Sequence, residues 1–143
     1  MGPGARGGEG RIADRRQGEE GRRTKGATDV PPQHVVHDDP AFFVGLRLTD
    51  VWYRWCEADD GSGEATLWLT ADDGASGATV EFTPDAERYG VEQYGPRALW
   101  DEVREAFLRW YELRRPPRSR FGLSVEDGRR WVWLDEPGRV VGG

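Results

Sequence analysis

Hydrophobic and polar residues follow two different periods along this chain, and the longer period predicts one long helix. From Leu99 to Leu113 the apolar residues recur every three or four positions, which is the spacing of one helix face. We expect the helix to begin at Gly95-Pro96, because proline fits the first helical position, and to end before Pro116-Pro117. Its predicted buried stripe consists of Leu99, Val103, Phe107, Trp110 and, as the last position, Leu113 or Arg114.

The shorter period predicts strands joined by tight turns. An Asp-Gly pair suits the positive φ angles of a hairpin turn, and this chain has such pairs at Asp60-Gly61, Asp73-Gly74 and Asp127-Gly128. The predicted strands flank them at residues 51–57, 65–70, 78–83, 121–126 and 130–135. In the last of these strands Trp131 and Trp133 share one face and Val132 and Leu134 share the other, so we expect it to be central or covered on both sides.

A second, shorter helix is predicted from Asp39 to Leu46. Asp39 can cap its backbone amides, and Pro40 can occupy its first position. The same apolar run, AFFVGLRL, also suits a buried strand, and periodicity does not separate the two interpretations. Together the elements predict an α+β fold, with a mainly antiparallel sheet of about five strands and one long amphipathic helix packed on it.

The first 33 residues differ in composition from the rest of the chain. They are rich in Gly and in charges of both signs and contain few apolar side chains, so they bury too little to offset the entropy of ordering. We therefore predict a disordered tail or linker over residues 1–33 and a small α+β domain over residues 34–143.

Charge and cysteine content restrict the partners and the compartment. The net charge of −6 disfavours a nucleic-acid partner, because an acidic surface repels phosphates. No window approaches the roughly 18 apolar residues of a membrane span, and no signal-peptide pattern precedes the domain. A single cysteine, Cys56, excludes a disulfide within the chain. We expect a cytoplasmic protein without a membrane or nucleic-acid partner.

No residue cluster in the sequence makes a complete catalytic, cofactor or metal site. The His34, His37, Asp38 and Asp39 cluster lies beside the predicted tail, whereas metal sites need three or four preorganised ligands. Cys56 has no histidine after it that would serve as its base, so we expect it to be a buried apolar residue. The glycine-rich start, GARGGEGR, lacks the preceding strand and following helix of a phosphate-binding loop. We expect no catalytic, cofactor-binding or metal-binding residues on this chain.

Aromatic residues and arginines provide the candidates for binding. Most of the aromatic side chains are expected in the core, with one or two left to line a groove as anchors for a peptide. Arginine beside an aromatic ring can pair with a carboxylate and stack, which suits an Asp-rich peptide. The predicted peptide-binding residues are Tyr89, Tyr94, Arg118, Arg120 and Trp131.

Three segments of the C-terminal half, QYGPRALWDEV, RFGLSV and WLDEP, carry a resemblance to a known family. They resemble the region that follows the catalytic domain in protein-L-isoaspartate O-methyltransferase homologues from bacterial gene clusters for lanthipeptides and ATP-grasp-modified peptides. The likeness extends over approximately residues 40–137 and is weaker before Phe82. In that family a Rossmann-like domain binds S-adenosylmethionine and methylates aspartate or isoaspartate carboxylates, and the appended region helps to engage the precursor peptide.

The resemblance implies a detached or truncated accessory domain of such a methyltransferase-like enzyme. It would bind the modified precursor peptide or the catalytic partner without chemistry of its own, and S-adenosylmethionine would belong to a separate catalytic domain. No catalytic residue of the family transfers to this chain, because the family's glycine-rich cofactor loop has no counterpart here. Two alternatives remain at this stage: a gene fragment without an independent role, and a small stand-alone enzyme.

Overall fold

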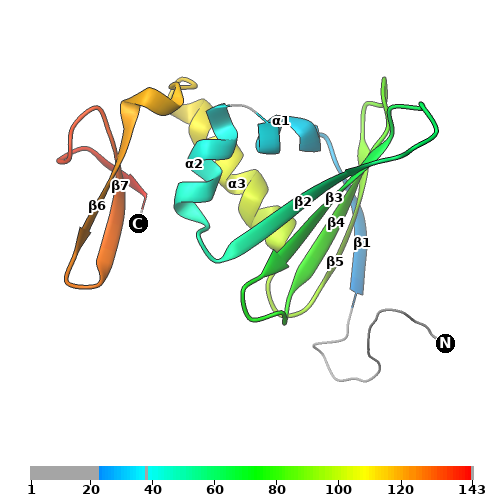
Figure 1. Ribbon diagram of the computed structural model, residues 1–143, viewed down its shortest axis with the longest axis horizontal. Helices are drawn as coiled ribbons and strands as arrows, with labels where there is room; N and C mark the ends of the chain where they lie inside the picture. Colours follow the sequence, from blue (N-terminus) through cyan, green and yellow to red (C-terminus); the bar gives the residue numbers. More distant parts are fainter. Residues whose placement is uncertain (1–22, 38, 143) are drawn as a thin grey trace.

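The computed structural model describes residues 23–37 and 39–142 and places three α-helices between two antiparallel sheets (Figure 1). The larger sheet has the strand order β1-β5-β4-β3-β2, and the smaller has the order β6-β7-β8. The helices are α1 (Pro32–His37), α2 (Asp39–Arg47) and α3 (Leu99–Glu112). The strands are β1 (Arg23–Thr28), β2 (Val51–Glu57), β3 (Ala65–Ala71), β4 (Gly77–Phe82), β5 (Tyr89–Tyr94), β6 (Phe121–Glu126), β7 (Arg129–Leu134) and β8 (Val140–Gly142). The α+β fold with a five-stranded antiparallel sheet and one long helix is thus confirmed.

All three Asp-Gly turns join antiparallel neighbours, as predicted. Asp60-Gly61 lies between β2 and β3, Asp73-Gly74 between β3 and β4, and Asp127-Gly128 between β6 and β7. In the last turn both residues have positive φ angles, 53° and 76°. This is the left-handed geometry in which glycine and aspartate are tolerated best.

The membership of the sheets differs from the prediction. Only β2, β3 and β4 of the five predicted strands belong to the large sheet, whereas β6 and β7 form the separate small sheet with β8. The large sheet is completed by β5 and by β1, which lies within residues predicted as tail. Residues 23–33 therefore contain a strand and the beginning of α1, and residues 1–22 lie outside the described part of the chain.

Helix α3 has the predicted face but a later start. Its buried residues are Leu99, Trp100, Val103, Ala106, Phe107 and Trp110, and each large side chain contributes about 1.5–3 kcal/mol when buried. The prediction that Pro96 opens the helix was wrong. Gly95 has φ +91°, which is not helical, and two of the amides that follow are held by side chains from the β3–β4 turn and from β5. The Arg97 amide donates to Ser76 Oγ at 3.0 Å, and the Trp100 amide donates to Gln93 Oε1 at 2.8 Å.

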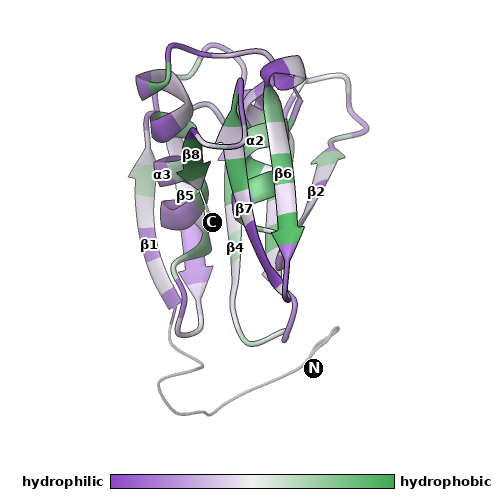
Figure 2. Ribbon diagram, turned by 90° about the vertical axis from the view of Figure 1, so that its left-hand side faces the viewer, coloured by the Kyte–Doolittle hydropathy of each residue, from purple (hydrophilic) through white to green (hydrophobic). Residues whose placement is uncertain are grey.

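The small sheet covers the helices on the side opposite the large sheet (Figure 1). Phe121 at the start of β6 stacks on Phe43 of α2 at 5.0 Å, which confirms Asp39–Arg47 as a helix that packs in the core. Strand β7 is central in its sheet, as expected from its two apolar faces, and Val132 and Leu134 are buried. Seen from this side, β1 and β2 lie at opposite margins of the large sheet, behind β6 and β7 (Figure 2). None of the described helices has the length and apolarity needed to cross a bilayer.

Candidate functional site

The two predicted binding tyrosines lie at opposite ends of β5. Tyr89 is buried, stacks on Phe82 at 5.8 Å and donates its hydroxyl hydrogen to the Ala86 carbonyl. Tyr94 lies over Gly77 on the other face of the sheet, where a Cβ at Gly77 would come within 2.5 Å of its ring. The Arg23 guanidinium covers the same ring at 5.6 Å. Tyr89 is thus a core residue, and Tyr94 is partly covered by its own sheet.

The two predicted arginines lie in the short turn Arg118–Arg120, and Trp131 lies in β7. Arg120 forms a two-pronged ion pair with Asp135, with distances of 2.7 and 2.8 Å. Its hydrogen bonds hold the pKa of Asp135 below the usual range of a carboxyl. Arg118 lies over the Phe42 ring at 5.6 Å. Among these five described residues no hydrogen bond, ion pair or ring contact joins any two, so the structure does not bring them into one site.

The ligand-type residues noted in the sequence do not gather either. His34 and His37 are in α1, and Asp38 lies outside the described residues. Within residues 23–37 and 39–142 no three His, Cys, Asp or Glu side chains are grouped as metal ligands. Cys56 is half-buried rather than fully buried, and its sulfur lies 3.5 Å from Arg54 Nε. The expectation of a buried cysteine was therefore wrong, because β2 lies at the edge of its sheet.

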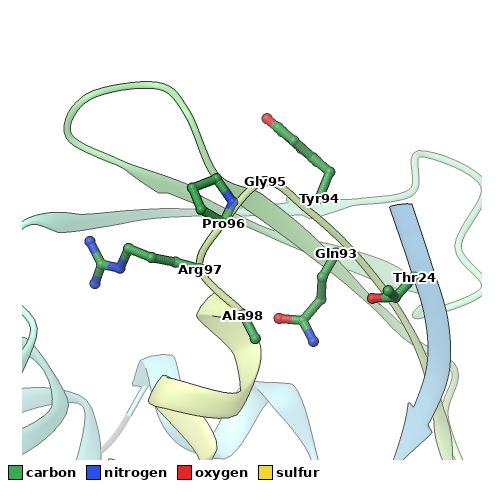
Figure 3. A pocket seen from close by; sticks show the side chains of 7 residues that line it. All are labelled: Thr24, Gln93, Tyr94, Gly95, Pro96, Arg97 and Ala98. Carbon is green, nitrogen blue, oxygen red and sulfur yellow. The ribbon is translucent and has the colours of Figure 1, made fainter. Parts of the chain in front are cut away.

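A pocket of about 270 Å³ lies where β5 turns into α3 (Figure 3). Its lining consists of Thr24, Gln93, Tyr94, Gly95, Pro96, Arg97 and Ala98. Two of the polar side chains that line it already have partners: Gln93 Oε1 accepts from the Trp100 amide, and Arg97, which points away from Thr24 and Gln93, pairs with Asp50 and Glu102. This hollow offers no free charge to a ligand.

Arg97 instead ties the start of β2 to the start of α3. Its guanidinium donates to Glu102 at 2.6 Å and to Asp50 at 2.8 Å. These bonds raise the pKa of Arg97 above the ordinary value of arginine, with Glu102 as the larger cause. The hydrogen bond from Arg97 also lowers the pKa of Asp50. We call these two ion pairs of Arg97 the clamp. The clamp holds Asp50, the residue before Val51, and so fixes the position at which β2 begins.

Strand β2 presents one side of its backbone to solvent. Antiparallel strands alternate between residues that bond to the neighbour and residues that point away from it. The bonds from the Ala58 amide to Glu64 and from the Asp72 amide to Asp50 show that the even-numbered residues of β2 bond to β3. The odd-numbered residues therefore direct their backbone groups outward. Since β2 is an edge strand, we call these groups of Val51, Tyr53, Trp55 and Glu57 the free edge.

Only one group of the free edge is used inside the described chain. The Val51 amide donates to the Leu48 carbonyl at 3.1 Å. The amides of Tyr53, Trp55 and Glu57, and the carbonyls of all four residues, have no hydrogen-bond partner among the described residues. An exposed row of backbone donors and acceptors is the template on which another extended chain can pair.

Large aromatic side chains accompany the free edge on both faces of the sheet. Trp52, Tyr53 and Trp68 are 65%, 56% and 50% exposed, which is unusual for side chains of this size. Trp52 is held by a 2.7 Å bond from its indole nitrogen to Asp72 Oδ1, and the Tyr53 hydroxyl donates to the Val36 carbonyl at 3.4 Å. Each of these rings offers apolar area that an added chain would bury.

Apart from its charged residues Arg54 and Glu57, β2 lacks the features that keep edge strands from pairing. Its pairing with β3 runs without a bulge over seven residues, and the sequence VWYRWCE contains neither Pro nor Lys. Sequence reasoning placed this strand correctly but not its role. Its local signal was the concentration of aromatic residues on both faces, and its place at an edge follows only from the strand order.

Comparisons with protein-family models, curated proteins and solved structures found no match to this chain.

Proposed function

We propose that this chain is a peptide-binding module that adds an extended peptide segment as a sixth strand beside β2. The observation that carries this proposal is the row of unused backbone groups at Tyr53, Trp55 and Glu57 on an edge strand without a bulge. Main-chain hydrogen bonds supply affinity in this mode of recognition, and side chains on the two faces supply specificity. The module itself performs no chemistry.

The resemblance of QYGPRALWDEV, RFGLSV and WLDEP supports a more specific proposal. The bound segment belongs to a precursor peptide that a protein-L-isoaspartate methyltransferase-like enzyme modifies in the cytoplasm. The methyl donor, S-adenosylmethionine, is bound by a separate catalytic domain. In the described structure QYGPRALWDEV spans the end of β5, the turn that follows and the first residues of α3, whereas RFGLSV and WLDEP lie in β6, in β7 and in the residues next to them. These segments build the scaffold around β2 and leave its free edge open.

A synthetic peptide tests the backbone pairing directly. The sequence Ile-Thr-Val-Asn-Val-Thr-Ile, aligned antiparallel to Val51–Glu57, places its Val and Ile residues opposite the free edge. We expect measurable binding by calorimetry. N-methylation of the two valines removes amides that face β2, and we expect this change to weaken binding about tenfold or more, since each lost bond contributes roughly 0.5–1.5 kcal/mol and the methyl groups obstruct the approach.

N-methylation of the two threonines is the matched control. These amides point away from β2 in the proposed alignment, so the same chemical change should leave the affinity nearly unchanged. Equal losses with both peptides, or no binding by the unmodified peptide, would contradict strand addition at this edge. If a dimer of the chain forms and is dissociated by Tyr53→Pro, the edge belongs to a second copy and the peptide proposal is wrong.

A further inference from the structure

The basic side chains on the outer face of the large sheet are paired with a carboxylate except at the free edge. On this face Arg23 and Lys25 of β1 form ion pairs with Glu92 of β5, at 2.9 and 3.7 Å. Arg54 of β2 lies on the same face, opposite Trp68 of β3. Among the described residues Arg54 has no carboxylate partner, and the one hydrogen bond from its guanidinium goes to the Cys56 sulfur. The edge of the sheet therefore ends in an exposed cation.

The alternation of the backbone places Arg54 where a partner side chain would come closest. Arg54 directs its own backbone groups toward β3, so in an added antiparallel strand the residue opposite it forms a non-hydrogen-bonded pair. Side chains in such pairs are closer than in hydrogen-bonded pairs, with Cα atoms about 4.5 Å apart. Opposite charges in this position stabilise a sheet and like charges destabilise it.

We infer that the peptide bound by this module carries a carboxylate opposite Arg54 and apolar side chains at the two neighbouring positions. The inference rests on the proposed function and names the class of peptide: an extended segment in which an Asp or Glu is flanked by apolar residues. Its apolar side chains lie on the inner face, beside Tyr53 and Trp55. Tyr53 is 56% exposed there, and Trp55 packs against Phe82 and His37.

The positive charge of Arg54 also disfavours the pairing of a second copy of this chain with the free edge. The antiparallel register that pairs all seven residues of two β2 strands places Arg54 opposite the Arg54 of the other copy. Like charges in direct cross-strand opposition destabilise the pair, and a non-hydrogen-bonded position brings them closest together. A separate peptide with a carboxylate at that position removes the conflict.

Peptides that differ only at the central residue test the inference. We expect the Asp-centred form of the probe, Ile-Thr-Val-Asp-Val-Thr-Ile, to bind about five- to tenfold more tightly than the Lys-centred form, with the Asn-centred form between them. Arg54→Glu should reverse the order, and Arg54→Gln should abolish the preference. Salt at about 1 M, which screens charges beyond about 3 Å, should reduce the difference.

Arg88→Glu serves as the matched control. Arg88 is exposed in the segment between β4 and β5 and has no ion pair among the described residues, so this variant makes the same change of charge away from the free edge. It should keep the preference for the Asp-centred peptide. If the three peptides bind wild-type protein equally, or if Arg54→Glu and Arg88→Glu shift the preference alike, the inference fails while strand addition stands. If no peptide binds, the proposed function fails as well.

Discussion

Replacing Gly95 with alanine is expected to lower the free energy of unfolding by about 3–5 kcal/mol, a large part of the 5–15 kcal/mol of an ordinary domain. Gly95 has φ +91°, a conformation that is strained for any residue with a Cβ. The new Cβ would also come within 2.1 Å of the Ala75 carbonyl oxygen and 2.7 Å of Ser76 Oγ. The β3–β4 turn would have to move, and the Ser76 bond to the Arg97 amide would be lost with it.

Gly90→Ala is the control for this prediction. Gly90 lies in β5, the strand that ends just before Gly95, and no atom comes within 4 Å of the position its Cβ would take. We expect a change of about 0.5 kcal/mol or less in either direction. Chemical denaturation of both variants measures the difference. Equal stabilities would show that Gly95 is not required for the start of α3 and for the clamp that positions β2.

Proline scanning of β2 is expected to give the second large effect. Arg54→Pro removes an amide that bonds to β3 and leaves a β3 carbonyl without its partner, so we expect a loss of about 2–4 kcal/mol relative to Arg54→Ala. Tyr53→Pro removes an amide that points to solvent, where proline is tolerated in edge strands. Its stability should lie within about 1 kcal/mol of Tyr53→Ala.

The two alanine variants separate the backbone effect from the loss of each side chain. Thermal or urea unfolding of the four proteins gives the two differences directly. If Tyr53→Pro is the more damaging change, the hydrogen-bond register of β2 is reversed, and the even-numbered residues face outward. The free edge as defined here would then be wrong.

Local patterns predicted the parts of the fold that local chemistry decides. The three Asp-Gly turns and the apolar stripe of α3 depend on neighbours within a few residues, and all are found. Strand β5, YGVEQY, and strand β1, RTKGAT, contain glycine and charged residues that locally disfavour strands. They are strands because each pairs with a neighbour distant in sequence. The start of α3 was misplaced for a similar reason, since its capping groups come from Ser76 and Gln93.

The candidate site was harder to predict than the fold. Tyr89 was a reasonable anchor by residue type, but its burial depends on Phe82 from another strand. Arg120 had a suitable charge, but Asp135 across the small sheet already pairs with it. The free edge of β2 follows from the order of strands in the sheet, which no single segment encodes. The lack of a carboxylate partner for Arg54 can be recognised only once the ion pairs of Arg23 and Lys25, on the same outer face of the large sheet, are known.

Amide hydrogen exchange of Tyr53 and Trp55, with and without the Asn-centred peptide, tests the central claim most directly. In the free protein these amides should exchange rapidly, whereas those of Arg54 and Cys56, which bond to β3, should be protected. Saturation with the peptide should protect Tyr53 and Trp55 and leave Arg54 and Cys56 as they were. Protection of Tyr53 and Trp55 before peptide is added, or no change at saturation, would contradict the account.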